Sequence, residues 1–184
     1  MLTVNAAGLR TQVGYDEHGK AVSETQLSDT YPAGVTTQTV YNAVGQIIQI
    51  TGPRVKNRVT GVDHQARTVN TYNANGDLTD ELTTDIVGSD QQRRTRHSFD
   101  ANDREISTTD AEGNTVRREF NATGQVAAVI DARGMRTETE FDVRGVAQKV
   151  TLKAYASPAG SVAHDIVLSE VLSFDFIEIG RAHV

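Results

Sequence analysis

The stretch from residue 120 to residue 145 reads FNATGQVAAVIDARGMRTETEFDVRG, and it decides the fold. Three four-residue turns of the form Asx-x-x-Gly punctuate it, beginning at Asn121, Asp131 and Asp142. This pattern is typical of a type I turn, because the Asx side chain accepts backbone N–H groups and Gly adopts φ > 0 to close the loop as a G1-type β-bulge. Short stretches rich in Val, Thr and Ile separate the turns. The pattern therefore predicts successive antiparallel β-hairpins.

The segment 135–141 shows the alternation expected of a half-buried strand. Met135, Thr137, Thr139 and Phe141 fall on one face, and charged residues at positions 136, 138 and 140 fall on the other. This is the period of two that a strand requires. Elsewhere too, a Thr precedes most of the turn aromatics by four residues and so shares their face. We expect aromatic–Thr stacking to link one repeat to the next, with roughly 0.2–1 kcal/mol per cross-strand pair.

An aromatic residue precedes the Asx of every second turn, and a second kind of turn lies between these aromatic turns. From residue 100 to residue 142 the turn-opening Asx residues alternate in steps of 10 and 11, which gives a period of 21 residues. The aromatic turns are Tyr15-Asp16 with Gly19, Tyr41-Asn42 with Gly45, Tyr72-Asn73 with Gly76, Phe99-Asp100 with Asp103 in place of Gly, Phe120-Asn121 with Gly124, and Phe141-Asp142 with Gly145. The second turns are Asp110 to Gly113 and Asp131 to Gly134. Asn5 to Gly8 has the same spacing to the next aromatic, so the chain begins in mid-repeat. Asp85 to Gly88 also fits the Asx-x-x-Gly pattern.

The repeat array is predicted to span residues 1–153. Residues 52–61 read as a polar insertion, an extended hairpin arm or loop, and residues 78–88 lengthen another unit. Residues 154–178 are predicted to be a diverged repeat or strand region, with one more turn at 157–160. Residues 179–184 look like the translation of a common sequencing adapter. We expect them to be non-native, with the reading frame continuing beyond Glu178.

Composition and charge exclude several classes of function. The net charge is −6 and no basic patch stands out, which argues against nucleic-acid binding. No apolar run approaches the roughly 18–20 residues that span a bilayer, and the N-terminus has no signal-peptide pattern, so any export signal is expected outside this chain. The chain has no Cys, hence no disulfide and no thiolate metal site.

The sequence offers no catalytic, cofactor or metal motif. The five His residues are scattered, and none pairs with another at metal-ligand spacing. Each Asx turn supplies one carboxylate or amide, whereas calcium needs six or more oxygens. A nucleophile elbow and a phosphate-binding loop are both missing. We therefore expect a protein that is not an enzyme and that uses its repeat residues structurally.

These alternating turns resemble the YD-repeat, or RHS (rearrangement hotspot), family, over residues 4–153. The departures are Asn or Phe within some aromatic-Asx pairs, Asp103 for Gly, and Ala for Pro in the second turns. The family includes bacterial RHS polymorphic toxins, insecticidal toxin-complex proteins, wall-associated proteins and the animal teneurins. The resemblance implies an all-β strip of antiparallel hairpins, without significant helix, that spirals into a hollow shell. Such shells usually end in an autoproteolytic Asp-containing motif, which this chain lacks, so no catalytic residue is carried over.

The resemblance also implies a function. The chain is expected to be a structural, non-catalytic segment of an RHS shell that encloses or presents a C-terminal effector domain absent from these residues. Its partners would be the rest of the shell and the effector, and its place would be secreted or on the bacterial cell surface. The alternative is a cell-surface adhesin or carbohydrate-binding module that contacts glycans, because aromatic rings stack on sugars.

Overall fold

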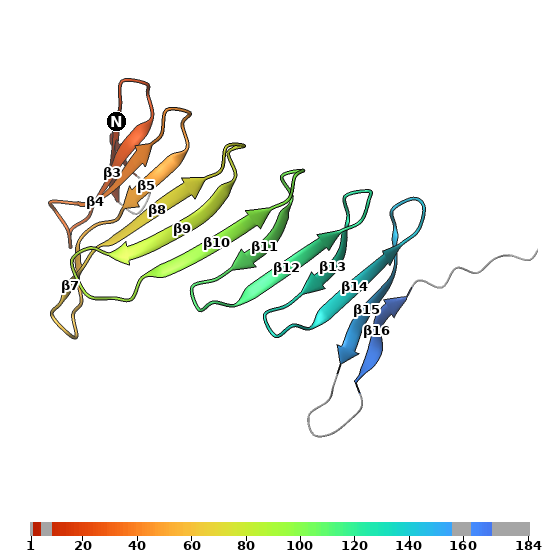
Figure 1. The fold of residues 1–184 in the computed structure, drawn as a ribbon. Coiled ribbons are helices and arrows are strands. Elements are labelled where there is room, and N and C mark those ends of the chain that lie inside the picture. The colour runs from red at the N-terminus through yellow and green to blue at the C-terminus, as the bar shows by residue number, and fades with distance from the viewer. Residues whose placement is uncertain (1, 5–8, 156–162, 171–184) are drawn as a thin grey trace, which may run out of the picture. The chain divides into compact units, whose positions relative to one another are not determined.

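The computed structural model describes residues 2–4, 9–155 and 163–170 and shows strands and turns in those ranges, with no helix (Figure 1). This confirms the predicted all-β strip of antiparallel hairpins. In this part of the chain, no helix is long and apolar enough to cross a membrane. The chain divides into two compact units, residues 1–114 and residues 115–184.

The first unit is a meander in which each strand pairs antiparallel with the next. Its strands are β1 (Leu2–Val4), β2 (Arg10–Tyr15), β3 (Ala21–Leu27), β4 (Val35–Tyr41), β5 (Ile47–Thr51), β8 (Ala66–Tyr72), β9 (Leu78–Asp85), β10 (Arg93–Phe99) and β11 (Glu105–Thr109). The polar insertion forms a separate two-stranded ribbon, β6 (Val55–Lys56) with β7 (Asp63–His64), between β5 and β8. Gly61 donates its N–H to the carbonyl of Asn57 at the ribbon's tip, at 2.8 Å.

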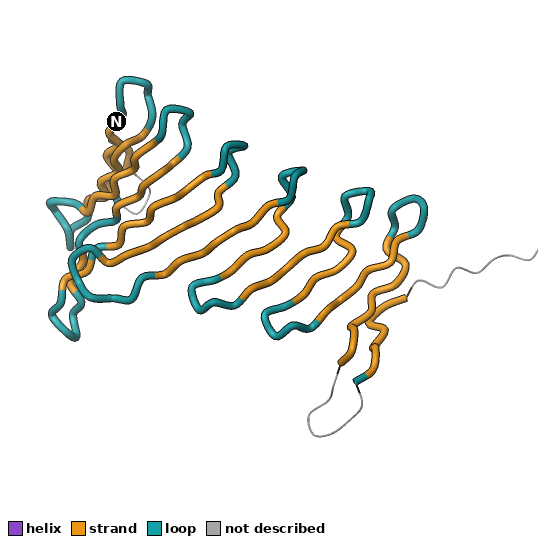
Figure 2. The backbone as a smooth tube through the Cα atoms, viewed as in Figure 1, coloured by secondary structure: helices purple, strands orange, loops and turns teal. Residues whose placement is uncertain are grey.

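The second unit continues the same pattern. Its strands are β12 (Thr115–Phe120), β13 (Val126–Ile130), β14 (Arg136–Phe141), β15 (Ala147–Tyr155) and β16 (His164–Glu170), paired in that order. Within each unit the aromatic turns follow one edge of the strip and the second turns follow the other (Figure 2). Three predicted features lie outside the described residues: the turns at 5–8 and 157–160, and the segment 179–184.

Every aromatic turn is accompanied by a β-bulge, which confirms the bulge expected from the glycine that closes the loop. In the last unit Phe141 stands opposite Ala147 while Glu140 stands opposite Lys149, so Gln148 is an extra residue. The same shift recurs beside Tyr15, Tyr41, Tyr72, Phe99 and Phe120. Bulges of this kind increase the local twist of a strand pair and are regular features of a fold.

The bulge changes which residues face each other across the hairpin. Each aromatic stands opposite the residue six positions later, which is Ala21, Ile47, Leu78, Glu105, Val126 or Ala147. Between repeats, Thr37 stands opposite Glu24, Thr68 opposite Ile50 and Thr137 opposite Val129, so the expected pairing of these Thr residues with aromatics is wrong. Two pairs of Thr residues meet directly across strands: the hydroxyls of Thr68 and Thr83 on β8 and β9, and those of Thr25 and Thr36 on β3 and β4, each lie 2.8 Å apart.

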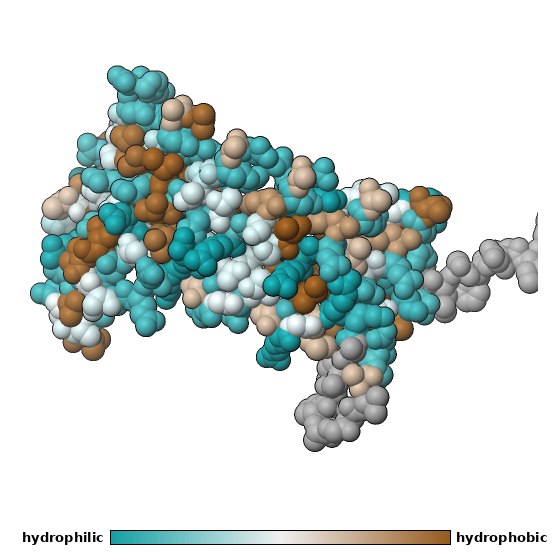
Figure 3. All heavy atoms as spheres, viewed as in Figure 1, coloured by the Kyte–Doolittle hydropathy of each residue, from teal (hydrophilic) through white to brown (hydrophobic). Residues whose placement is uncertain are grey.

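The strip has very little core. Among the described residues only Ala128, 2% exposed, and Thr151, 7% exposed, are buried. Both lie in one cross-strand row of the second unit, in which Ala128 and Thr151 flank Glu138. Arg136 lies beside this row, with paired hydrogen bonds of 2.7 and 2.8 Å to Glu119 and one of 2.7 Å to Glu138. On the visible face of the molecule, hydrophobic residues form separate groups among hydrophilic ones (Figure 3).

The outermost described strands predict self-association of the isolated chain. Leu2 and Val4 on β1 are 59% and 63% exposed, and Val167 and Leu168 on β16 are 47% and 56% exposed. An exposed apolar edge strand is a template for pairing with another chain. We expect the 184-residue chain alone to be oligomeric or poorly soluble in size-exclusion chromatography with light scattering.

Matched lysine variants test where that association occurs. Val4→Lys with Leu168→Lys should shift the chain toward the monomer. Val143→Lys should leave the association unchanged, because Val143 is fully exposed at a turn tip rather than on an edge strand. A wild-type chain that is monomeric and melts cooperatively would contradict the expectation.

Candidate functional site: the aromatic turns

Apart from Asp85 to Gly88, eight Asx-x-x-Gly or Asx-x-x-Asp turns are described, and the Asx side chain organises each of these eight in the same way. In the last turn, Oδ1 of Asp142 accepts the N–H groups of Arg144 and Val146, both at 2.8 Å. Asp16, Asn42, Asn73, Asp100, Asp110, Asn121 and Asp131 make the equivalent pair of bonds, at 2.8–3.2 Å. The fourth residue of each turn also donates its N–H to the Asx carbonyl. These bonds satisfy the turn's backbone, as the sequence pattern predicts.

The fourth residue of each turn adopts the left-handed conformation. The seven described glycines in this position have φ between 77° and 97°. Asp103 takes the same position with φ 59°, and it is the one residue other than Gly with positive φ in the described ranges. The tetrapeptide from Asp85 to Gly88 differs from these turns. Gly88 does not have a positive φ, and the chain runs on to Gln92 before β10 begins.

Tyrosine hydroxyls join consecutive repeats. The Tyr41 hydroxyl donates to the carbonyl of Ala21 at 3.0 Å, and the Tyr72 hydroxyl donates to the carbonyl of Ile47 at 2.8 Å. In both cases the acceptor is the residue opposite the aromatic of the preceding repeat. Tyr41 and Tyr72 therefore each tie their own repeat to the preceding repeat, through a hydrogen bond between the side chain and the backbone.

The residue after the turn glycine makes a second tie, which the sequence analysis missed. Gln46 Nε2 donates to the Gly76 carbonyl at 2.9 Å, and Gln125 Nε2 donates to the Gly145 carbonyl at 2.7 Å. At the first such position the Lys20 ammonium lies 5.1 Å from the centre of the Tyr41 ring, a cation–π distance. The recurrence of Gln five residues after an aromatic is the signal that points to this contact.

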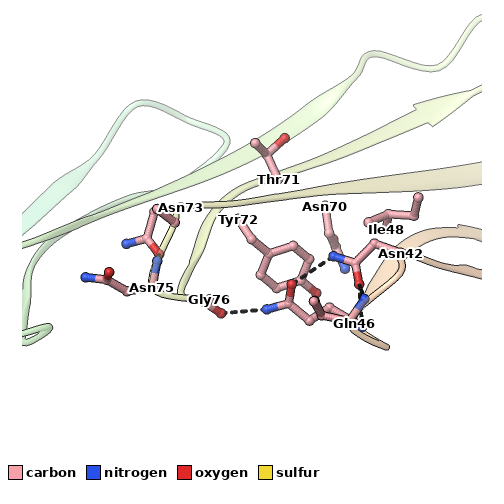
Figure 4. Close-up of a pocket in the computed structure, with 11 residues that line it drawn as sticks. Asn42, Gln46, Ile48, Asn70, Thr71, Tyr72, Asn73, Asn75 and Gly76 are labelled. Carbon is pink, nitrogen blue, oxygen red and sulfur yellow. Dashed lines mark hydrogen bonds between the residues drawn. The ribbon is translucent and has the colours of Figure 1, made fainter.

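A hollow of about 720 Å³ lies between the second and third aromatic turns, and it is rich in amides (Figure 4). Its amide groups are largely occupied within the protein. Asn42 Nδ2 donates to Gln46 Oε1 at 2.8 Å, and Asn70 Nδ2 donates to the Ile47 carbonyl at 3.0 Å, beside the Tyr72 hydroxyl. Asn70 Oδ1 is buried without a hydrogen-bond partner. The amide groups of Asn42 and Asn70 and the hydroxyl of Tyr72 thus form hydrogen bonds within the protein, and few donors are left for a ligand.

Four of the turn aspartates have a lowered pKa. Hydrogen bonds from backbone N–H groups stabilise the charged carboxylates of Asp16 and Asp142 and so lower both pKa values. The largest contribution comes from the N–H of Lys20 for Asp16 and from the N–H of Val146 for Asp142. The pKa of Asp100 is lowered first by the Arg104 guanidinium, and that of Asp110 first by the Asn114 side chain. The turns are therefore most stable with these carboxylates ionised.

This predicts a loss of stability in acid. A group with a lowered pKa in the folded state stabilises the fold at pH values above its ordinary pKa of about 4, and that stability is lost as the pH falls through the lowered value. We expect the wild-type free energy of unfolding, measured by urea titration between pH 7 and pH 2, to fall below about pH 4.

A variant with Asn at positions 16, 100, 110 and 142 should show a shallower fall, because Asn serves the same turn position at residues 42, 73 and 121 without titrating. Asp29→Asn, outside all eight turns, is the control. Equal slopes for the three proteins would refute the assignment.

The comparisons with known proteins agree with this geometry. The RHS Repeat family matches residues 99–137. The structure of TcdB2-TccC3 without its hypervariable C-terminal region is similar with a TM-score of 0.54 at 14% identity, over 94% of this chain and 11% of that chain. The Tc holotoxin pore of Photorhabdus luminescens is similar with a TM-score of 0.52 at 13% identity, over 94% and 11%. No curated protein matches.

The chain thus spans about a tenth of the length of the solved chains it resembles. At these identities the likeness shows the fold alone. The repeat turns and the strand order agree with the match to the RHS Repeat family over residues 99–137, and the chain has the fold seen in the solved TcdB2-TccC3 structure.

Proposed function

We propose that this chain is a non-catalytic wall segment of an RHS shell that encloses or presents a C-terminal effector domain. The observation that carries the proposal is the use of the motif residues. The Asx side chains of the aromatic turns bond within their own turns, the tyrosine hydroxyls bond to the preceding repeat, and the glutamine amides bond to the next repeat. These interactions stabilise a wall of stacked repeats and are not directed at a ligand.

The thin core supports the same proposal. A single layer with two buried residues in its described part gains little stability from burial inside the segment. Repeat proteins obtain the remaining stability from neighbouring repeats. A shell supplies such neighbours on both sides of the strip. We therefore propose that the partners are the remainder of the same shell and an effector domain, in a protein that is secreted or displayed on the bacterial surface.

The division of the chain belongs to this proposal. Residues 1–153 would be the repeat array and residues 154–178 a diverged continuation that includes β16 (His164–Glu170). Residues 179–184 would be foreign to the gene. Under this division the native wall extends beyond the residues present here.

The second candidate is a surface adhesin or carbohydrate-binding module. The observation in its favour is the amide-rich hollow beside Tyr72 (Figure 4). Sugar recognition needs free donors and an open aromatic face, whereas the Tyr72 hydroxyl and the neighbouring amides are already engaged. We therefore expect a glycan array probed with the chain to show no binding above background.

Long-read sequencing of the source locus across the codon for Glu178 separates the two candidates. The shell proposal expects the frame to continue through more Asx-x-x-Gly hairpins into an unrelated small domain. A frame that runs instead into a wall-anchoring or membrane-anchoring segment, with no distinct terminal domain, would overturn the shell proposal in favour of the adhesin.

A further inference from the structure

Three potential metal ligands converge at the base of the β6–β7 ribbon. Nδ1 of His64 lies 2.6 Å from Oδ2 of Asp85 and 3.2 Å from Oδ2 of Asp90, and the three ligand atoms lie within 4.8 Å of one another. His64 comes from β7, Asp85 ends β9, and Asp90 belongs to the loop before β10. No spacing rule connects these positions, so the sequence analysis expected no metal site, and the fold brings them together.

Asp85 is held rigidly for this role. Its side chain is 6% exposed, and its Oδ1 accepts the N–H groups of Gln65, Val87 and Gly88 at 3.0, 3.1 and 2.9 Å. These backbone donors, that of Gln65 first, hold the pKa of Asp85 well below its ordinary value. The carboxylate is thus ionised and oriented, with Oδ2 directed at His64. Metal-binding carboxylates are commonly fixed by second hydrogen bonds of this kind.

Glycine at position 88 lets the backbone lie close to two of the ligand atoms. Gly88 is not among the residues with positive φ, so its backbone conformation does not require glycine. A Cβ at this position would lie 2.2 Å from Oδ2 of Asp85 and 2.7 Å from Nδ1 of His64. The close approach of Asp85 and His64 thus depends on the absence of a side chain at residue 88. A hollow of about 720 Å³, lined by all three ligand residues, gives access to their ligand atoms.

From this geometry we infer that His64, Asp85 and Asp90 bind a divalent transition-metal ion such as zinc. One imidazole nitrogen and two carboxylate oxygens are a donor set that Zn²⁺ accepts, with water completing the coordination. Asp90 is 70% exposed, so its side chain is free to rotate toward the ion. A bound ion fastens the base of the inserted ribbon to the end of β9 and to the loop that leads into β10.

The test measures zinc bound to the complete 184-residue chain, expressed without a histidine tag. After equilibrium dialysis against micromolar zinc at pH 8, mass spectrometry of the metal content gives the zinc-to-chain ratio. The wild type should bind one zinc per chain. His64→Ala should bind none above background, whereas His97→Ala should behave like the wild type, because His97 pairs with the single carboxylate of Glu105 at 3.3 Å.

A milder variant guards against misfolding. Asp90→Asn, at an exposed loop position, should leave the circular dichroism spectrum unchanged and weaken zinc binding by about tenfold or more. Zinc should raise the unfolding midpoint of the wild type but not that of Asp90→Asn, because an ion that binds only the folded state stabilises it. A wild-type chain without zinc, or zinc retained equally by His64→Ala and Asp90→Asn, would overturn the inference.

Discussion

Replacing Tyr72 with Ala is expected to cost about 3 kcal/mol of the free energy of unfolding, near the lower end of aromatic-to-alanine losses because the ring is only half-buried. The substitution removes the ring between the second and third repeats together with its hydrogen bond to the Ile47 carbonyl, 2.8 Å long. Urea unfolding of the chain measures the loss. The edge-lysine variant of Val4 and Leu168 is a suitable background, because it limits association.

Two further substitutions separate the hydroxyl from the ring. Tyr72→Phe should cost only about 0.5–1 kcal/mol, because Asn70 Nδ2 continues to donate to the same carbonyl. Phe99→Tyr should be neutral or stabilising by about 0.5 kcal/mol if its new hydroxyl reaches back to the preceding repeat as Tyr41 and Tyr72 do. Tyr15→Ala, where the side chain is 51% exposed, should cost less than Tyr72→Ala. Equal losses at positions 15 and 72 would contradict a tie between repeats.

Replacing Gly134 with Val is expected to cost about 2 kcal/mol, through the backbone alone. Gly134 has φ +82°, and a Cβ built there meets no heavy atom within 4 Å. Steric crowding with neighbours is therefore excluded as a cause, and the remaining penalty is that of a β-branched residue in the left-handed region. The same urea titration measures the loss.

Gly134→Asn is the matched control, because Asn tolerates the left-handed conformation better than other residues with a side chain. We expect it to lose less than half as much stability as Gly134→Val. Asp103 shows that an acidic residue already occupies this position in one repeat, at φ 59°. If Val and Asn at position 134 were equally harmless, the turn would not depend on the left-handed residue.

The sequence predicts the turns well because their chemistry is local. An Asx side chain bonds to N–H groups two and four residues later, and a glycine three residues later closes the loop, so a window of five residues contains the interaction. The faces of a strand are predicted less well: the alternation expected for 135–141 is not seen, because positions 135 to 139 are all partly buried and Glu138 lies between the buried Ala128 and Thr151. Recognition of the repeat family rests on the local turn pattern.

Features that depend on the register between strands escape a single sequence. The tie from Gln46 to Gly76 joins residues thirty positions apart. The cluster of His64 with Asp85 and Asp90 exists only because the ribbon insertion places β7 beside the end of β9. Such contacts require the pairing of distant strands, which no short pattern encodes.

The most direct test of the shell account is an electron cryomicroscopy structure of the complete protein that the source locus encodes. The account predicts that residues 9–155 form part of the wall of a closed shell, with their strands continued by further repeats and with protein density inside. Repeats arranged around no enclosed space, with the strip exposed to solvent on both faces, would contradict it.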